Sequence, residues 1–378
     1  MDKFSDIRPY TDEEAREAFK RIANDPNIGP ITQYIKPGLP VEMMRGLLAS
    51  LTSVRDFQFK VMYDVVKSIL KQTTAGVTHS GIENLKDGKT HLLISNHRDI
   101  ILDPAIIQAL LYENNVDTTE IAVGDNLITS QFIEDITRSN GMIKVVRGGT
   151  PREIYSNSNH LSEYLRSKIA AGVCSAWIAQ RNGRSKDGKD ETSQGLVKML
   201  QMSGSGDFAK DYADLNIVPI SISYQYEPCD FLKARELYIS KREQYVKQPG
   251  EDLKSMLTGL TQYKGGVHFY FAPSLSEEVI GACAALDKNE RYKAIAESID
   301  KEILSNYKLW NNNYIARDIL DGTSRYEKYY SVEEKETFLS YMESGISKIV
   351  EAEKWIDAAE LREIFLAIYA NPVAAVER

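Results

Sequence analysis

Between residues 81 and 280 the chain alternates short apolar runs, rich in β-forming residues, with segments whose apolar residues recur at helical spacing. The apolar runs are HLLIS (91–95), EIAVG (120–124), GMIKVV (141–146), VCSAWIA (173–179), NIVPISISYQY (216–226) and GVHFYF (266–271). Helical patterns such as DPAIIQALLYE and SNHLSEYLRSKIAAG lie between them. Because strands that alternate with helices are typical of an α/β fold, we expect a mixed, largely parallel sheet flanked by helices.

The two ends of the chain lack this alternation and have helical patterns. Thr11, followed by three acidic residues, predicts a helix that runs to about Ala23, and residues 41–70 predict one long or broken helix. After residue 280 the pattern is helical to the end. A length of 378 residues is enough for two or three domains. We therefore expect an N-terminal helical region (1–80), an α/β domain (81–280) and a C-terminal helical region (281–378).

Charge and cysteine content limit the class of protein. The formal net charge of −8 argues against a nucleic-acid partner, because nucleic-acid-binding proteins normally carry a basic domain. Three widely spaced cysteines without a CxxC motif favour a reducing compartment. The N-terminus is charged, unlike a signal peptide, and no apolar run approaches the roughly 20 residues that span a bilayer. We expect a cytoplasmic location, with peripheral contact at the inner face of the membrane as an option.

One segment could provide that membrane contact. The run LPVEMMRGLLASL (39–51) is the best candidate for a membrane-surface or acyl-binding face. The alternative is an ordinary helix whose apolar stripe faces the protein core.

The densest chemical signal is SNHRDIILDPA (95–105), directly after the first apolar run. His97 lies at the predicted strand end, where functional groups of open α/β sheets gather, and an imidazole is suited to be a general base near neutral pH. Asp103 or Asp99 could accept a hydrogen bond from the other ring nitrogen. Asp103 followed by Pro104 also predicts the start of a helix, with Asp103 as its N-cap. Taken alone, the pattern is better explained by a helix cap and a loop histidine.

A basic stretch later in the chain favours the functional interpretation of His97. Between residues 144 and 190 there are nine Lys or Arg and four Asp or Glu, a local charge of +5. Arg147 follows the run 141–146, and Arg181 and Arg184 follow the run 173–179. Since arginine binds phosphate oxygens through two parallel hydrogen bonds, arginines at neighbouring strand ends predict an anion site. A solvated surface face is the alternative for the other basic residues of the stretch.

The ordered set of motifs resembles that of the glycerolipid acyltransferases, which acylate glycerol 3-phosphate and lysophosphatidate. The four matching blocks are Asn96-His97 with Asp103, Gly141 with Arg147, the loop Asn182-Gly183-Arg184-Ser185, and Val218-Pro219. The first is an HX4D-like motif with one extra residue, because five residues separate His97 from Asp103 where the family has four. The resemblance covers roughly residues 80–275. The run DPAIIQALL looks most like the soluble plastid-type glycerol-3-phosphate acyltransferases, which carry an N-terminal helical domain and no spanning helix.

The resemblance implies an O-acyltransferase of glycerophospholipid biosynthesis. His97 would take the proton from a hydroxyl of glycerol 3-phosphate or a lysophospholipid, and that hydroxyl would attack an acyl thioester directly. Asp103, with Asp99 as the alternative, would pair with the imidazole. No covalent acyl-enzyme is expected, because the chain has no Gly-x-Ser-x-Gly or Gly-x-Cys-x-Gly elbow. The expected substrate-binding residues are Asn96, Arg98, Lys144, Arg147, Arg181, Gly183, Arg184, Ser185 and Lys186.

The remaining expectations concern the acyl donor, cofactors and metals, and the acceptor. The donor is expected to be acyl-coenzyme A or the thioester of acyl carrier protein, and the sequence does not choose between them. Neither a cofactor nor a metal is expected, because the five histidines have no HxxxH or HExxH spacing and thioester acylation needs no ion. A lyso-aminolipid acceptor, whose carboxylate could use the same arginines, is an alternative. A non-catalytic protein that binds lipid or acyl carrier protein is another, suggested by the irregular His/Asp spacing.

Overall fold

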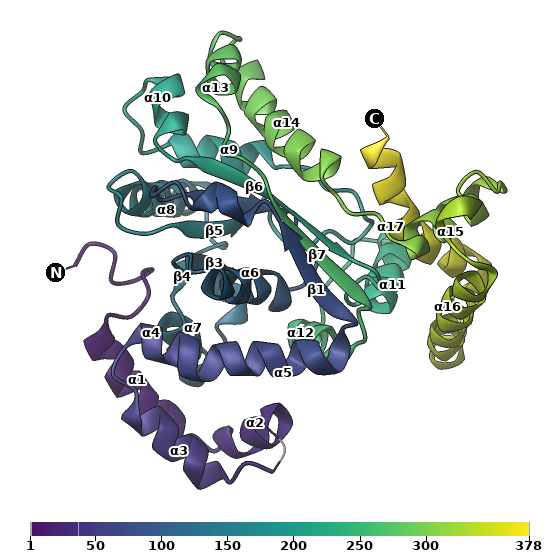
Figure 1. Cartoon of the computed structure of the whole chain (residues 1–378), viewed down its shortest axis with the longest axis horizontal. Coiled ribbons are helices and arrows are strands. Elements are labelled where there is room, and N and C mark those ends of the chain that lie inside the picture. The colour runs from purple at the N-terminus through teal and green to yellow at the C-terminus, as the bar shows by residue number, and fades with distance from the viewer. Residues whose placement is uncertain (1, 37, 378) are drawn as a thin grey trace.

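The computed structural model describes residues 2–36 and 38–377, and within these residues seven strands form one sheet in the order β1-β7-β6-β2-β5-β3-β4 (Figure 1). The strands are β1 (Gly76–Ser80), β2 (Leu92–Ser95), β3 (Glu120–Gly124), β4 (Met142–Val145), β5 (Ala176–Ala179), β6 (Ile217–Tyr224) and β7 (Gly266–Phe271). Only β6 and β7 pair antiparallel; the other neighbouring strands are parallel. The expected mixed, largely parallel sheet is therefore confirmed.

Each of the six apolar runs contains one of these strands, and the sheet also begins earlier than expected. Strand β1 lies in the region expected to be helical, before residue 81. Its sequence GVTHS contains one large apolar residue and lies at the edge of the sheet, where it pairs with β7 in parallel. Because an edge strand can be held by the hydrogen bonds of a single neighbour, its sequence need not carry a strong apolar pattern.

The N-terminal helices confirm the helical character of this end of the chain. They are α1 (Asp12–Asn24), α2 (Ile28–Ile35), α3 (Val41–Ser50), α4 (Val54–Phe57), a π-helical turn (Gln58–Met62) and α5 (Tyr63–Thr73). Thr11 and Glu14 form a capping box at the start of α1, as the acidic first turn predicts. The predicted helix over 41–70 is broken at Leu51, whose backbone is extended. Helix α3 buries Met44 and Leu48, so most of the apolar face of residues 39–51 packs into the core.

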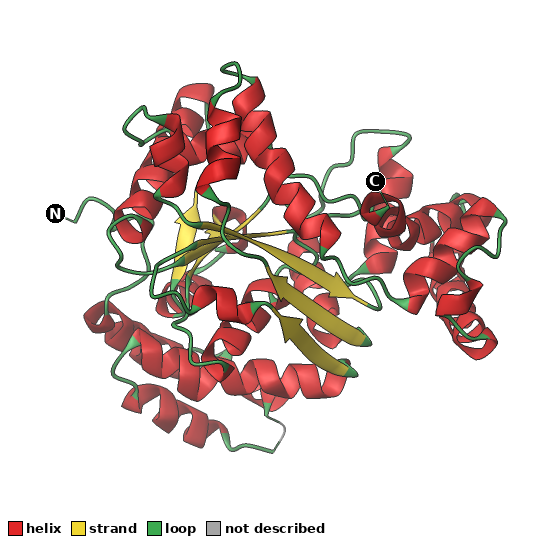
Figure 2. Cartoon of the chain, turned by 45° about the horizontal axis from the view of Figure 1, so that its top comes forward, coloured by secondary structure: helices red, strands yellow, loops and turns green. Residues whose placement is uncertain are grey.

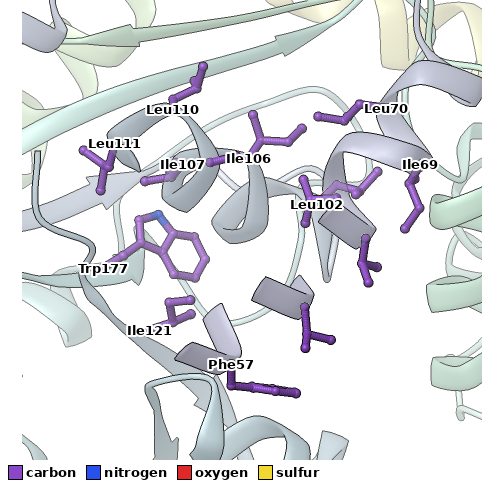
Figure 3. Close-up of a cluster of buried hydrophobic side chains, with 14 of the residues drawn as sticks. Phe57, Ile69, Leu70, Leu102, Ile106, Ile107, Leu110, Leu111, Ile121 and Trp177 are labelled. Carbon is purple, nitrogen blue, oxygen red and sulfur yellow. The ribbon is translucent and has the colours of Figure 1, made fainter. Parts of the chain in front are cut away.

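Helices cover both faces of the sheet (Figures 1 and 2). The remaining helices are α6 (Leu102–Glu113), α7 (Gln131–Ser139), α8 (Pro151–Ile169), α9 (Gln194–Gln201), α10 (Phe208–Ala213), α11 (Asp230–Ser240), α12 (Glu251–Thr261), α13 (Glu277–Ala284), α14 (Glu290–Ser305), α15 (Asn311–Asp321), α16 (Val332–Ala352) and α17 (Ala358–Val376). Ile106 and Ile107 of α6 pack with Trp177 of β5 on one face (Figure 3). Leu92, Ile94 and Val197 belong to the core of the other face, with α8, α9 and α14.

The C-terminal helices form a third core beside the sheet rather than on it (Figure 1). Helices α15, α16 and α17 pack with α11 around Phe338, Phe365 and Tyr369. The expected helical C-terminal region is thus confirmed. Cys174, Cys229 and Cys283 are free thiols. Among the described residues, no helix combines the length and apolar character needed to cross a bilayer.

Candidate active site

The parallel strands bring the candidate residues to one edge of the sheet. Strands β2, β3, β4, β5 and β6 run in the same direction, so their carboxyl ends lie along one edge. His97 follows β2, Arg147 follows β4 and Arg184 follows β5. This edge is where open α/β sheets usually place their ligands.

His97 and Asp103 form a hydrogen-bonded pair at this edge. Nδ1 of His97 lies 2.9 Å from Oδ2 of Asp103, whose carboxylate is fully buried, while the imidazole keeps 14% of its side-chain surface exposed. The same Oδ2 accepts the backbone N–H groups of Arg98 and Asp99, and Oδ1 accepts the hydroxyl of Tyr224 across 2.8 Å. With four hydrogen bonds on one carboxylate, its orientation is fixed. The imidazole ring also packs edge-on against Trp177.

Asp103 does not cap helix α6, contrary to the sequence prediction. The helix begins at Leu102, so Asp103 is inside its first turn. The capping contacts come from Asp99, whose Oδ1 accepts the backbone N–H groups of Ile101 and Leu102 at 2.9 and 2.8 Å. The extra residue between His97 and Asp103 therefore lies in a loop that Asp99 stabilises.

Asp99 is the alternative partner of His97, and its contacts lie elsewhere. No hydrogen bond between Asp99 and His97 is found in the described part of the chain, and there Oδ2 of Asp99 is buried without a hydrogen-bond partner. Burial raises the pKa of Asp99, and the neighbouring charge of Asp103 raises it further. The positive charge of Arg184 opposes this rise.

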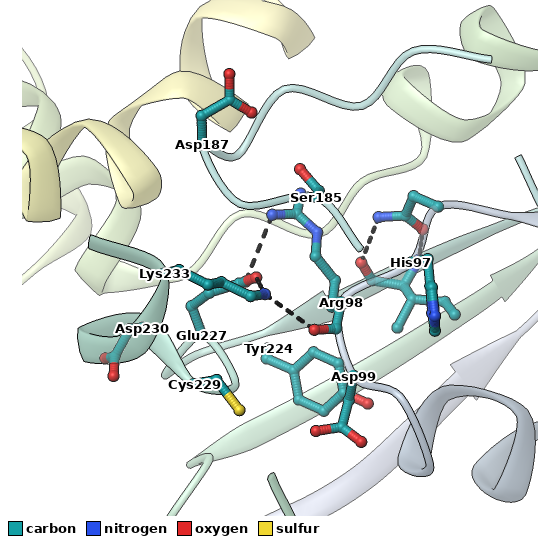
Figure 4. Close-up of polar contacts among 12 residues, drawn as sticks. His97, Arg98, Asp99, Ser185, Asp187, Tyr224, Glu227, Cys229, Asp230 and Lys233 are labelled. Atoms are coloured by element: carbon teal, nitrogen blue, oxygen red, sulfur yellow. Dashed lines mark hydrogen bonds and ion pairs between the residues drawn. The ribbon is translucent and has the colours of Figure 1, made fainter. Parts of the chain in front are cut away.

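Arg98 is expected to bind substrate, but the structure gives its side chain a different role. It is fully buried and forms ion pairs with Asp190 and Glu227. Lys233 of α11 pairs with Glu227 and also donates a hydrogen bond across 2.9 Å to the backbone carbonyl of Arg98 (Figure 4). The opposite charges of these buried groups neutralise one another. The side chain of Arg98 therefore stabilises the loop after His97 and is not free to contact a phosphate.

Asn96, also expected to bind substrate, has its side chain engaged in contacts within the protein. Its side chain is fully buried, exchanges two hydrogen bonds with the backbone of Ile222 at 2.9 and 2.8 Å, and donates to Asp190. The amide therefore ties the end of β2 to β6, directly before His97.

The loop after β5 contacts the backbone of His97. The backbone N–H of Ser185 donates to the carbonyl of His97 across 2.7 Å, and the Ser185 side chain is buried. Lys186 forms an ion pair with Glu236 of α11. Gly183 and Arg184 precede this contact, so the loop presents Arg184 next to the residues that hold His97.

The two arginines of the predicted anion site differ in exposure. Arg184 is half-buried, and its Nη1 is buried without a hydrogen-bond partner within residues 2–36 and 38–377. Arg147 is exposed and donates a hydrogen bond to Asn126 across 3.5 Å. Because a buried guanidinium nitrogen without a partner gains from an anion, Arg184 fits a phosphate or carboxylate group, and Arg147 follows a strand that ends at the same edge of the sheet.

The other two basic candidates lie in different surroundings. Arg181 is half-buried, and its charge acts on Asp190 of the buried ion network. Lys144 lines a small surface hollow with Asp6 and His160, and no residue lining that hollow belongs to the His97 loop. The structure thus groups His97, Asp103 and Arg184 with the backbone of Ser185 and separates Lys144 from them.

Sequence reasoning did not identify Tyr224 or Lys233 as parts of this site. Tyr224 ends β6 at the same edge as His97, so the strand-end rule could have identified it. Lys233 lies on α11 and is 2% exposed, and no local pattern marks a lysine that becomes buried in this way.

Residues 76–223 match the family model described as Acyltransferase. No sequence among curated proteins matches the chain. Among solved structures, the 1-acyl-sn-glycerophosphate (LPA) acyltransferase PlsC from Thermotoga maritima is similar over 77% of this chain and 95% of its own chain, with 12% sequence identity and a TM-score of 0.39.

Proposed function

We propose, on the premise that residues 76–223 match the Acyltransferase family model, that the chain is an O-acyltransferase of glycerophospholipid biosynthesis. It transfers a fatty acyl group from an acyl thioester to a hydroxyl of glycerol 3-phosphate or a lysophospholipid. The observation that carries the proposal is the hydrogen bond between His97 Nδ1 and the buried Asp103 carboxylate. This bond leaves Nε2 as the ring nitrogen available to a substrate hydroxyl.

In the proposed reaction His97 is the general base. Nε2 takes the hydroxyl proton while the hydroxyl oxygen attacks the thioester carbonyl carbon and a new C–O bond forms. The tetrahedral intermediate then collapses, the C–S bond breaks, and the imidazolium gives its proton to the departing thiolate. Asp103 stabilises the imidazolium between these two steps, and a general base of this kind contributes about 10²–10⁴-fold to the rate.

Arg147 and Arg184 are proposed to hold the anionic group of the acceptor. Fixing that group positions the hydroxyl beside Nε2, and such positioning supplies much of the remaining rate acceleration. The buried, unpaired Nη1 of Arg184 supports this role. Arg98 and Lys186 are left out of this site because both already have carboxylate partners within the protein.

Cofactor, donor and location belong to the same proposal. No cofactor or metal takes part, because acyl transfer from a thioester to a hydroxyl needs only a base and an acceptor. The donor is acyl-coenzyme A or acyl carrier protein. We place the protein in the cytoplasm, in peripheral contact with the membrane that receives its lipid product. The three free thiols support a reducing compartment, and the exposed apolar side chains Val246, Leu253 and Leu257 support contact with a lipid surface.

The experiment that tests the proposal combines each acyl donor with each acceptor. Thioester consumption is measured with acyl-coenzyme A and acyl carrier protein, each without acceptor and with glycerol 3-phosphate, lysophosphatidate or a lyso-aminolipid. We expect acceptor-dependent turnover that His97→Ala abolishes while the circular dichroism spectrum stays unchanged. Turnover that survives in a folded His97→Ala variant would remove His97 from the mechanism, and absence of turnover with every pair would overturn the proposed function.

A further inference from the structure

Helix α17 of the C-terminal region is connected by hydrogen bonds to both loops of the candidate active site. One loop follows β2 and carries His97, and the other follows β5 and carries Arg184. The helix lies beyond residues 76–223, which match the Acyltransferase family model, and it packs against α11 beside the sheet (Figure 1). Two of its side chains, Tyr369 and Asn371, are connected to different loops.

Tyr369 fixes the loop after β6 from the side of α17. Its hydroxyl accepts the backbone N–H of Glu227 across 3.0 Å and donates to a carboxylate oxygen of Asp230 across 2.7 Å. Tyr369 is 2% exposed, and Glu227 and Asp230 are also buried, so each of these hydrogen bonds is costly to lose. The position of the Glu227 backbone, from which its side chain extends, is therefore set by α17.

The side chain of Glu227 connects this constraint to the loop of His97. Its carboxylate forms an ion pair with Lys233, whose ammonium group also donates to the backbone carbonyl of Arg98 across 2.9 Å (Figure 4). The backbone N–H of Arg98 donates to the Asp103 oxygen that lies 2.9 Å from Nδ1 of His97. Each non-covalent step from α17 to the imidazole is thus a direct hydrogen bond or an ion pair.

Helix α17 also holds the loop after β5. The side-chain amide of Asn371 donates to the backbone carbonyl of Asp187 across 2.7 Å. Gly188 packs so closely on the helix that a Cβ atom there would lie 2.2 Å from the carbonyl oxygen of Ile368. Pro372 lies within α17 and has no N–H to donate to the carbonyl four positions earlier, which is that of Ile368. The loop therefore packs where α17 lacks one helical hydrogen bond.

We propose that α17 positions the general base relative to the anion site, with Tyr369 and Asn371 as two positioning residues. Tyr369 acts on the loop of His97, and Asn371 acts on the loop of Arg184. Because the base must reach the acceptor hydroxyl while the arginine binds the anionic group, the separation of the two loops limits the distance between these groups in an acceptor. The inference rests on the proposed function, since it takes His97 as the base and Arg184 as part of the anion site.

Tyr369→Phe and Asn371→Leu test the two positions separately, because each nearly keeps the shape of the side chain and removes its hydrogen-bonding group. Tyr369→Phe should lower kcat by about three- to tenfold with little change in either KM. It should also move the acidic limb of the kcat/KM profile to lower pH, because a looser bond between His97 and Asp103 stabilises the imidazolium less. Asn371→Leu should instead raise the acceptor KM by about three- to tenfold, with the donor KM and the acidic limb unchanged.

Amide hydrogen exchange gives a readout that does not depend on turnover. The backbone N–H of Arg98 donates to the Asp103 carboxylate, and that of Ser185 donates across 2.7 Å to a carbonyl of the other loop. Tyr369→Phe should speed exchange at Arg98 several-fold, because it loosens the loop that carries this N–H. Asn371→Leu should speed exchange at Ser185 for the same reason.

Arg362→Gln is the matched control, because Arg362 pairs with Glu343 of α16 and joins two C-terminal helices to each other. It should change neither the kinetics nor the exchange at these two N–H groups. Equal effects of Tyr369→Phe and Asn371→Leu on kcat and acceptor KM, or effects no larger than those of the control, would overturn the inference. If Tyr369→Phe does not fold, the acceptor KM of Asn371→Leu decides, since that position is only half-buried. The expected exchange in a protein that transfers no acyl group would overturn the proposed function and leave the role of α17 standing.

Discussion

The hydroxyl of Tyr224 lies 2.8 Å from Oδ1 of Asp103, on the carboxylate that His97 contacts through its other oxygen. The three side chains form a hydrogen-bonded chain from β6 through α6 to the loop after β2. Burial and the charge of Asp103 raise the pKa of Tyr224 well above its ordinary value, so the phenol stays protonated and remains a donor. In the proposed mechanism Tyr224 would therefore be a positioning residue, because it contacts Asp103 and not the imidazole itself.

Tyr224→Phe tests this role. Loss of the donor leaves Oδ1 unpaired in the interior, which costs about 1–3 kcal/mol of stability. It also leaves more negative charge on Asp103, which then stabilises the imidazolium more strongly. We expect kcat to fall several-fold with little change in either KM, and the acidic limb of the kcat/KM profile to move to higher pH. A drop in activity at an unchanged pH profile would make Tyr224 a packing residue only.

Arg184 and Lys186 are two residues apart, and we expect their alanine variants to behave differently. Arg184→Ala removes a guanidinium whose buried Nη1 is unpaired, and should raise the KM for glycerol 3-phosphate by about tenfold or more with little effect on the donor KM. Lys186→Ala removes a partner of Glu236 and should leave the acceptor KM within about twofold of wild type. Steady-state kinetics with each substrate varied in turn checks both. Equal effects of the two variants would contradict the assignment of Arg184 to the anion site.

The outcomes for Asp103 and Arg98 show what the sequence could and could not predict. The carboxyl ends of parallel strands share an edge of the sheet. The strand pattern alone therefore predicted that His97, Arg147 and Arg184 lie along the same edge. The sequence left two candidate partners for His97, because Asp99 and Asp103 both follow it within six residues, and the hydrogen bond to Asp103 distinguishes them. The partners of Arg98 are Asp190 and Glu227, 92 and 129 positions away, and no local pattern reports such contacts.

The contact of helix α12 with the loop after β2 could not be predicted from the sequence either. Nothing in the sequence of α12 (251–261) relates it to the loop after β2, because its contact is between Gly259 and Asp99, which lie far apart in the chain. Strand β1 was missed for a related reason. Its conformation depends on pairing with β7, in which Gly76 lies opposite Gly266, and the side-chain hydroxyl of Thr78 also donates a hydrogen bond to the carbonyl of Val267.

Gly188 connects the loop of Arg184 to the C-terminal helices. Its φ of +77° is in the left-handed region, and a Cβ atom there would lie 2.2 Å from the carbonyl oxygen of Ile368 in α17. Gly188→Ala should therefore lower the free energy of unfolding by about 2–4 kcal/mol and reduce acyl transfer by displacing the loop.

Gly88→Ala is a matched control for that variant. Gly88 has the same φ of +77°, and a Cβ atom there would meet no other atom within 4 Å. This substitution should cost only about 1 kcal/mol, from backbone strain alone. Chemical denaturation of both variants measures the difference. Equal losses of unfolding free energy in the two variants would mean that the close contact with α17 adds nothing to the cost of backbone strain.

Asp300 gives the protein a pH-dependent contribution to stability. Burial raises its pKa from 3.8 to about 6, although Thr192 donates hydrogen bonds to its carboxylate from both its backbone N–H and its hydroxyl. Between pH 4 and 6 the folded protein therefore binds more protons at this site than the unfolded chain does. The free energy of unfolding then falls as the pH rises, because the slope follows the proton difference between unfolded and folded states. The contribution is fully present below about pH 4 and is lost as the pH rises through about 6.

Asp300→Asn should remove this slope, since asparagine does not titrate and its Oδ1 can still accept both hydrogen bonds from Thr192. We expect the difference in unfolding free energy between variant and wild type to shift in favour of the variant from pH 4 to pH 7, by at most about 1.4 kcal/mol per pH unit. Urea denaturation at several pH values measures this difference, which cancels the titration of every other group that the substitution leaves unchanged. A difference that is constant with pH would show that Asp300 ionises in the folded protein as it does in the unfolded chain. The hydrogen bonds between Thr192 and Asp300 would then make no contribution to the pH dependence of the unfolding free energy.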